Sequence, residues 1–411
     1  MRTLPLAGKP LAAQSWPAAT VAASLLRELG AEPDTRPPAA AVVFNGCVVD
    51  CPETSSDEDW AATGLAALTG RPSGPLLVPV GAPGTAARGL TLAIRALGGV
   101  ADDGAALLGM RRDILPLSRG GTKSANGTAR LLPTRDGWLA ISLARSSDFE
   151  LVPALVSGEA SDPWSEIAMW ASRVETASAV DRAATLGLAA AGLGEQMHAR
   201  PWSITPWPKT SRPRRQERPV VVNLGALWAA PLAAHVLHRS GATVVDVRTG
   251  RGEDVNDRWR DRLHDGHQTE HVDLTSPDGR NHLRELVTEA DVVIEASRPR
   301  ALRQLGVDAE SIMPDKRPRV WLRLTGYPRP AERIAYGDDA AVAGGLVAHD
   351  ANGPVFVGDA IADPLTGLRA ALAALACLSE GGSWVVDLAM SGVAAHAAGI
   401  PDSGHNQCKL K

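Results

Sequence analysis

The residues best suited to chemistry are two carboxylates, Asp359 and Asp363, in the segment 353–370. Asp363 directly precedes Pro364 and an alanine- and leucine-rich helical pattern that runs to about Cys377. From these residues alone, the simplest interpretation is an N-cap aspartate with proline at the first helical position, which stabilises a helix by about 1 kcal/mol. A carboxylate at a helix N-terminus also lies beside free N–H groups, which can hold an oxyanion next to a nucleophile.

An earlier segment, 74–91, repeats this pattern with one residue of slippage between the two registers. Four residues before Gly367 the later copy has Asp363, whereas four residues before Gly89 the earlier copy has Thr85. The motif therefore occurs twice and its carboxylate once. We expect one working site and one structural relic.

Composition narrows the class of protein. A chain of 411 residues exceeds the usual size of a single hydrophobic core, so we expect two or more domains. The hydrophobic content of 45%, the charged content of 21% and the net charge of −4 are typical of a soluble globular protein and give no case for nucleic acid or a membrane as partner. No apolar run approaches the roughly 20 residues that span a bilayer, and the proline-broken N-terminus is unlike a secretory signal. We expect a cytoplasmic location.

The cysteines and histidines do not predict a metal site. Cys47 and Cys51 could share a metal, but no histidine or second cysteine pair stands nearby to complete the site. With Cys377 and Cys408 they are interpreted as free thiols in a reducing cytoplasm. The four histidines within 264–282 lack a helical or strand spacing that would make them converge, so we expect no metal there.

The second half of the chain alternates strands with helices, which predicts a parallel sheet with right-handed crossovers. Strands are expected at 220–224, 243–247, 271–274, 291–295 and 319–324, with helices at 230–240, after Ser276 and at 299–305. Neither a Gly-x-Gly-x-x-Gly motif nor a Walker motif follows the first strand, which argues against a nicotinamide or nucleoside-triphosphate site.

The middle of the chain has a different pattern. Residues 110–200 read as an α+β module, with a turn and strand over 134–142 and helical patterns at about 148–157 and 164–196. Residues 201–219 are rich in proline and arginine and predict an extended linker docked by its two tryptophans. The basic cluster at 212–218 could contact nucleic acid, but a solvated linker fits the acidic chain better.

A run of short motifs over residues 220–395 points to a family. The motifs are Asn223–Pro231, His238–Arg248, Val272–Arg280, Ala290–Pro299, Gln304–Gly306, Thr325–Tyr327, Tyr336–Asp339, Gly345-Leu346, the Asp363 motif and Trp384–Leu388. In this order they resemble the family III CoA-transferases, also called the CaiB/BaiF family, which includes formyl-CoA transferase and the 2-methylacyl-CoA racemases. The resemblance implies an α/β fold: a large domain with a Rossmann-like parallel sheet and a smaller α+β domain.

The resemblance also implies a division of the chain. Residues 1–109 would be a degenerate copy of the large domain without the catalytic aspartate, and residues 110–200 the small domain. After the linker 201–219, residues 220–411 would form the large domain that carries the catalytic motif. Since the family forms interlaced dimers, we expect a homodimer, which could take the interlaced form.

For the chemistry, the resemblance makes Asp363 a covalent nucleophile. The carboxylate attacks an acyl-CoA thioester and gives an aspartyl anhydride, then an aspartyl-CoA thioester from which a carboxylate acceptor takes the CoA. Asp359 is the weaker candidate, because the family motif places its carboxylate four residues before the glycine, here Gly367. Acyl-CoA and a carboxylic acid are then the substrates, with no permanently bound cofactor.

The phosphates of CoA require basic groups at the loops that follow the strands. The resemblance places Arg248, Arg251 and Arg298 there, although each could equally be a surface arginine. It also assigns three further residues to the CoA site: Ala229, Gly326 and Asp339. Asp339 could instead be a structural turn acid.

Parts of the chain depart from the family pattern. A basic run of the family is replaced here by residues 264–269, and a family lysine by Asp246. In the racemases a histidine stands where this chain has Asp338, and two acids form a comparable acid–base pair only if one is strongly perturbed. We therefore expect a CoA-transferase, with a racemase as the first alternative and a non-catalytic CoA-ester-binding or structural subunit as the second.

Overall fold

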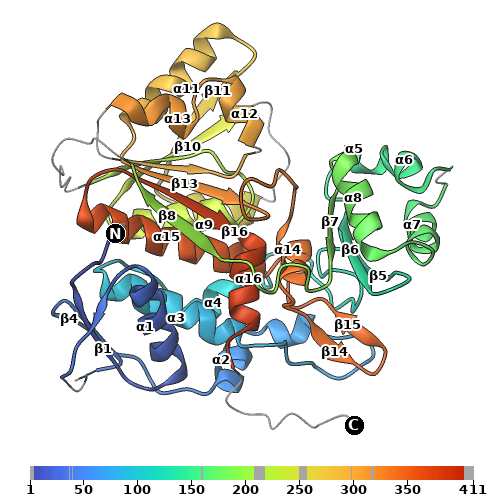
Figure 1. Ribbon diagram of the computed structural model, residues 1–411, viewed down its shortest axis with the longest axis horizontal. Coiled ribbons are helices and arrows are strands. Elements are labelled where there is room, and N and C mark those ends of the chain that lie inside the picture. Colours follow the sequence, from blue (N-terminus) through green and yellow to red (C-terminus); the bar gives the residue numbers. More distant parts are fainter. Residues whose placement is uncertain are drawn as a thin grey trace.

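The computed structural model describes most of the chain (Figure 1). The described residues are 4–36, 38, 40–158, 161–207, 218–249, 257–297, 299–315 and 319–401.

The largest element is a seven-stranded sheet in the order β11-β10-β9-β12-β13-β16-β8. Its strands are β8 (Trp202–Pro206), β9 (Val220–Asn223), β10 (Thr243–Thr249), β11 (Gln268–Val272), β12 (Val292–Glu295), β13 (Val320–Thr325) and β16 (Trp384–Ala389). Neighbouring strands are parallel except β8, which pairs antiparallel with β16. The predicted parallel α/β sheet is confirmed, although the strand expected at 271–274 lies at 268–272.

Helices cover both faces of this sheet (Figure 1). The helices of this half are α9 (Ala229–Arg239), α10 (Asp257–His264), α11 (Pro277–Glu289), α12 (Pro299–Gln304), α13 (Ala309–Ile312), α14 (Gly337–Ala343), α15 (Ala362–Glu380) and α16 (Met390–Ala398). Of these, α14 packs against β6 (Trp138–Ser142) and β7 (Ala189–Gly192) from the middle of the chain rather than against the large sheet. Successive side chains of a strand point to opposite faces. Val221 and Leu322 accordingly join the core of α9 and α15. Val222 and Trp321 join the core of α11 and α13 on the other face.

The N-terminal part contains a smaller sheet in the order β2-β1-β3-β4. Its elements are β1 (Pro10–Ala13), α1 (Pro17–Glu28), β2 (Glu32–Pro33), β3 (Val42–Phe44), β4 (Cys47–Val49), α2 (Ser56–Thr63), α3 (Pro83–Ala96) and α4 (Gly104–Gly109). β1, α1 and β2 repeat the strand–helix–parallel strand opening of β9, α9 and β10. β3 and β4 then pair antiparallel, so this part shares only the opening of the large sheet.

The repeated glycine of the two motifs lies at a helix–helix contact in each half. A Cβ atom on Gly89 of α3 would lie 2.5 Å from Val21 Cγ1 of α1. A Cβ atom on Gly367 of α15 would lie 2.5 Å from the carbonyl oxygen of Ala229 in α9. Only glycine permits such close packing. α15 also packs against α3, which joins the two halves in one hydrophobic core.

The middle of the chain forms a separate antiparallel sheet in the order β5-β6-β7, seen with its helices on the right of Figure 1. Its elements are β5 (Ala129–Pro133), β6 (Trp138–Ser142), α5 (Ser146–Phe149), α6 (Val152–Val156), α7 (Pro163–Ala171), α8 (Thr176–Leu186) and β7 (Ala189–Gly192). The α+β prediction is confirmed, but the helical pattern expected over 164–196 was wrong in its middle, where α7 ends and α8 begins, and at its end. Gly187 adopts φ 76°, which ends α8 and lets β7 begin.

The segment expected as a linker enters the fold at its start. Residues 202–206 form β8, Trp202 stacks on the Arg369 guanidinium at 4.3 Å, and Trp207 packs against the core beside α11. Residues 208–217 lie outside the described part. A short hairpin, β14 (Ala348–Asp350) and β15 (Gly353–Val355), precedes the Asp363 motif. In the described ranges, no helix combines the length and apolar character needed to cross a bilayer.

Candidate active site

A cavity of about 280 Å³ lies at the carboxyl ends of β9, β12 and β13. Gly225 follows β9, Ser297 follows β12 and Gly326 follows β13, and all three line it. The strand order reverses between β9 and β12, and ligands of open α/β sheets bind at this switch point. The position of the cavity therefore follows from the topology of the sheet.

Asp363 is the buried carboxylate that lines this cavity, and its side chain is 8% exposed. The expectation that it caps its helix was wrong. α15 begins at Ala362, so Asp363 is the second helical residue and makes no capping hydrogen bond. The chain turns sharply just before, because Ala360 adopts φ 42° and its carbonyl accepts a hydrogen bond from the Asp363 N–H at 2.9 Å.

The main chain of Gly337, at the start of α14, packs closely against the Asp363 carboxylate. The Gly337 N–H acts to lower the pKa of this carboxyl group. A Cβ atom on Gly337 would lie 2.4 Å from Asp363 Oδ2 and 2.3 Å from the Ala360 carbonyl oxygen. A side chain here would displace the carboxylate, so glycine is required for the contact.

Burial raises the pKa of Asp363 to about 7, against an ordinary value of 3.8. The guanidinium of Arg111 opposes this shift, while the carboxyl groups of Asp338 and Asp359 add to it. A carboxylate with a raised pKa and little surrounding solvent is a stronger base and nucleophile than an exposed one.

Asp338 and Asp359 lie together behind Asp363, bridged by one amide. Asn126 Nδ2 donates to Asp338 Oδ2 and to Asp359 Oδ1, both at 3.2 Å. The orientation of this amide is fixed, because Asn126 Oδ1 accepts from the Ser124 hydroxyl at 2.8 Å and from the Thr128 N–H at 2.9 Å. The amide therefore presents both N–H groups to the two acids.

Asp338 supports the sharp turn that precedes α15. Its Oδ1 accepts the main-chain N–H of Ala360 at 2.9 Å, so both of its oxygens are hydrogen bonded. Burial, and then the neighbouring Asp359, raise the pKa of Asp338 to about 7. Burial also raises the pKa of Asp359.

Arg111 supplies positive charge to this group of acids. Its Nε lies 3.1 Å from Asp359 Oδ2, and its guanidinium covers the rings of Trp228 at 4.8 Å and Trp259 at 5.5 Å. Neither Arg111 nor Asn126 was foreseen from the sequence. Both lie more than 200 residues before Asp359, and no motif or spacing marks them.

The structure separates the residues that the sequence assigned to CoA binding. Ala229 and Gly326 line the cavity with Asp363. Asp339 is fully buried and accepts the Ser142 hydroxyl at 2.7 Å and the Tyr336 N–H at 3.1 Å, which are the contacts of a structural acid. Burial raises its pKa to about 7.

The three arginines fall outside this cavity or outside the described residues. Arg248 lies near the end of β10 and lines a different, open cavity of about 460 Å³. Arg251 and Arg298 lie outside the residues that the structure describes. Their assignment to CoA stays a prediction.

The corresponding position of the first motif is closed. The Thr85 hydroxyl donates to Asp59 Oδ2 at 2.6 Å, and the Thr54 hydroxyl donates to Asp59 Oδ1 at 2.6 Å. Arg88 forms an ion pair with the same carboxylate. Thr85 and Asp59 have no exposed surface. The Asp59 carboxylate therefore has its partners inside the protein.

Comparison with known proteins points to CoA-transferases. Residues 219–400 match the sequence model of CoA-transferase family III. The chain is 27% identical over 200 residues to the succinyl-CoA–D-citramalate CoA-transferase of Chloroflexus aurantiacus, covering 43% of this chain and 50% of that protein. It is 26% identical over 181 residues to the succinate–glutarate CoA-transferase of Agrobacterium fabrum, covering 38% and 45%. It thus spans about half the length of these relatives.

Among solved structures, a CAIB/BAIF family protein from Brucella suis is 26% identical, with a TM-score of 0.40. The match covers 44% of this chain and 55% of that one.

Proposed function

We propose that the chain moves CoA from an acyl-CoA donor to a carboxylate acceptor with Asp363 as nucleophile, in keeping with the match of residues 219–400 to CoA-transferase family III. The observation that carries the proposal is the position of Asp363. It is a buried carboxylate that faces the cavity at the switch point of the matched sheet.

The proposed reaction begins when the ionised carboxylate of Asp363 attacks the thioester carbonyl. The carbon–sulfur bond breaks, CoA leaves as thiolate, and an aspartyl anhydride remains. The thiolate then attacks the aspartyl carbonyl, which releases the first carboxylate and leaves an aspartyl-CoA thioester. An acceptor carboxylate repeats the sequence in reverse and leaves as the new CoA ester.

Three features of the site support this role. Gly337 has no side chain and so leaves room for the carboxylate, since a Cβ atom there would lie 2.4 Å from Asp363 Oδ2. The N-terminal end of α15 places a positive dipole beside the oxyanions that form during acyl transfer. Arg111 holds back the rise in the pKa of Asp363, so a larger fraction of the nucleophile is ionised near neutral pH.

The racemase alternative has one observation in its favour and two against it. The pKa of Asp338 is raised to about 7. The objection that Asp338 and Asp363 both have ordinary carboxyl pKa values therefore no longer holds. Both oxygens of Asp338 are, however, hydrogen bonded, to Ala360 and to Asn126. Asp338 is also not among the residues that line the cavity, whereas a base must reach the substrate α-carbon.

Trapping the covalent intermediate tests the proposal. The chain is incubated with a panel of acyl-CoAs that includes succinyl-CoA, treated with hydroxylamine and mapped by peptide mass spectrometry. A hydroxamate or CoA adduct on the peptide that contains Asp363 supports transfer. Asp359→Ala is the matched control and should keep the adduct. Binding of CoA without an adduct from any donor would favour the racemase or the non-catalytic subunit.

The expected homodimer and cytoplasmic location stay predictions.

If the chain is a non-catalytic subunit, CoA transfer should depend on a second polypeptide. Purification of the chain alone, followed by the trapping experiment, separates this alternative from the proposed enzyme.

A further inference from the structure

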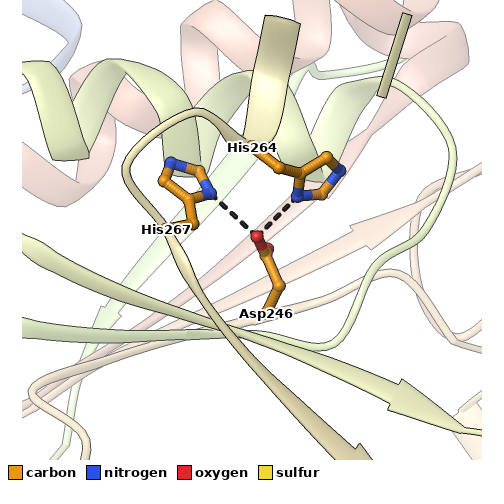
Figure 2. A group of neighbouring side chains, drawn as sticks. All are labelled: Asp246, His264 and His267. Carbon is orange, nitrogen blue, oxygen red and sulfur yellow. Dashed lines mark hydrogen bonds and ion pairs between the residues drawn. The ribbon is translucent and has the colours of Figure 1, made fainter. Parts of the chain in front are cut away.

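A second group of chemically able side chains lies on the large sheet, away from Asp363. Asp246 is in β10, His264 ends α10, and His267 directly precedes β11. Figure 2 shows both imidazole rings turned toward the Asp246 carboxylate. The proposed transfer reaction uses none of these residues.

A tight turn brings the two histidines together. The His267 N–H donates to the His264 carbonyl at 3.0 Å, and Gly266 between them adopts φ 77°, a conformation that favours glycine. The expectation that the histidines would not converge was therefore wrong for this pair, because a turn replaces the helical or strand spacing.

The ligand atoms of the three side chains are close enough to share one ion. His264 Nδ1 lies 2.5 Å and His267 Nδ1 lies 2.8 Å from Asp246 Oδ2. One donor atom from each of the three residues lies within 4.8 Å of the others. Two imidazoles and a carboxylate, with no thiolate, form a donor set that suits zinc and similar divalent cations.

The carboxylate is held from behind. Asn223 Nδ2, at the end of β9, donates to Asp246 Oδ1 at 2.8 Å and leaves Oδ2 for the histidines. Metal-binding carboxylates are commonly hydrogen bonded in this way by a second residue.

The burial of the rings differs in a way that suits a site with an entry path. The His267 side chain is fully buried, and its Nε2 has no hydrogen-bond partner within the described part of the chain. The polar contact of this ring is therefore directed at Asp246. His264 lines the open cavity of about 460 Å³, through which a cation and a completing water ligand can enter.

We propose that Asp246, His264 and His267 bind one divalent transition-metal cation of the zinc class. The cation takes the place of the protons that Nδ1 of each ring otherwise presents to Asp246 Oδ2. Since three protein ligands leave a coordination position free, a water molecule or an anion from the open cavity completes the shell.

Metal titration of the full chain tests this proposal. Protein stripped with a chelator is titrated with Zn²⁺ by calorimetry and with Co²⁺ by absorption spectroscopy. We expect one tight site per chain. His264→Gln and Asp246→Asn should each weaken binding at this site by at least about 100-fold, since even loss of a supporting residue costs 10–100-fold.

His271→Gln is the matched control, because His271 lines the same cavity but does not contact Asp246. It should bind metal like the natural chain. Circular dichroism verifies that each variant folds. If Asp246→Asn does not fold, the test rests on His264→Gln, because His264 is at a partly exposed position. Three results would each overturn the proposal. The first is the absence of a tight site, and the second is undiminished binding by the folded His264→Gln variant. The third is thiolate-to-cobalt absorption, which would assign the metal to cysteines.

Discussion

At the scale of single residues, the proposed site and the core beside it contain acids whose ionisation is suppressed by burial. Asp338, Asp339 and Asp363 each have a pKa of about 7. Arg111 is the cation that opposes this effect at Asp363. The ionisation of this small group should therefore govern both activity and stability near neutral pH.

The rate of transfer should depend on pH through Asp363. Because only the ionised carboxylate is a nucleophile, kcat/KM should fall about tenfold per pH unit below about 7. Arg111→Met removes the group that lowers this pKa, so the falling limb should move to higher pH. A pH profile of kcat/KM measures both effects. Arg112→Met, at the adjacent exposed arginine, is the control and should leave the limb in place.

The proposed nucleophile, Asp363, should be indispensable to turnover. Asp363→Ala should reduce transfer by several orders of magnitude and leave CoA binding largely intact, because the reaction then lacks its covalent step. Asp359→Ala should cost much less. Steady-state kinetics with calorimetric CoA binding measures these effects, and retained turnover in Asp363→Ala would contradict the assignment.

The stability of the protein should also depend on these acids. The pKa of Asp338 is about 7 in the folded chain and about 4 in the unfolded chain. Its contribution to the free energy of unfolding is therefore fully present below about pH 4 and is lost as the pH rises to about 7. Asp338→Asn removes this loss. The unfolding free energy of the variant, relative to the natural chain, should therefore improve between pH 5 and pH 8, by about 1 kcal/mol or more. Urea denaturation at both values measures it, and a pH-independent difference would refute the explanation.

At the scale of elements, the site is positioned by helices that pack unusually closely. α15 contacts α9 through Gly367, and α3 contacts α1 through Gly89. The repeated glycine thus has a packing role in both halves. The residue four positions before it is the cavity-lining Asp363 in the second half and the fully buried Thr85 in the first. This packing accounts for the glycine in both copies of the motif, although the first copy has Thr85 at the position of Asp363.

Gly367→Ala should destabilise the fold and disturb the site together. The added methyl group would approach the Ala229 carbonyl oxygen to 2.5 Å, and overpacking of this kind costs about 1–3 kcal/mol. Thermal and chemical denaturation measure the loss. Gly158→Ala is the control, since its Cβ would meet no atom within 4 Å, and it should be nearly neutral.

At the scale of the whole molecule, residues from distant parts of the chain complete the site. Asp363 and Asp359 come from the part matched to the family, Asn126 from the turn before β5, and Arg111 from the segment after α4. The core formed by α3, α9 and α15 joins these parts. The site therefore requires the fold as one unit.

A buried ion pair tests this cooperation. Arg369 of α15 is 1% exposed, donates to Glu28 of α1 at 2.9 Å and stacks on Trp202 of β8. Glu28→Gln leaves a buried cation without its partner and should cost about 3 kcal/mol. Denaturation followed by tryptophan fluorescence and by far-ultraviolet circular dichroism should show one coincident, shifted transition. Glu32→Gln, at an exposed position, should leave it unchanged.

The sequence by itself determined the features that depend on local pattern. Apolar runs and helical periodicity predicted the strands of the parallel sheet and the α+β module, because these patterns reflect which faces are buried. The order of short motifs indicated the family, and the resemblance to the family motif, four residues before Gly367, singled out Asp363.

Only the tertiary structure decided which distant side chains meet. The turn at Ala360 placed Asp363 inside its helix rather than at its cap. Arg111 and Asn126 met Asp359 across more than 200 residues, and a turn at Gly266 brought two histidines to Asp246. Burial then set the pKa values of the acids. Such contacts depend on the packing of whole elements, which no local pattern in the sequence records.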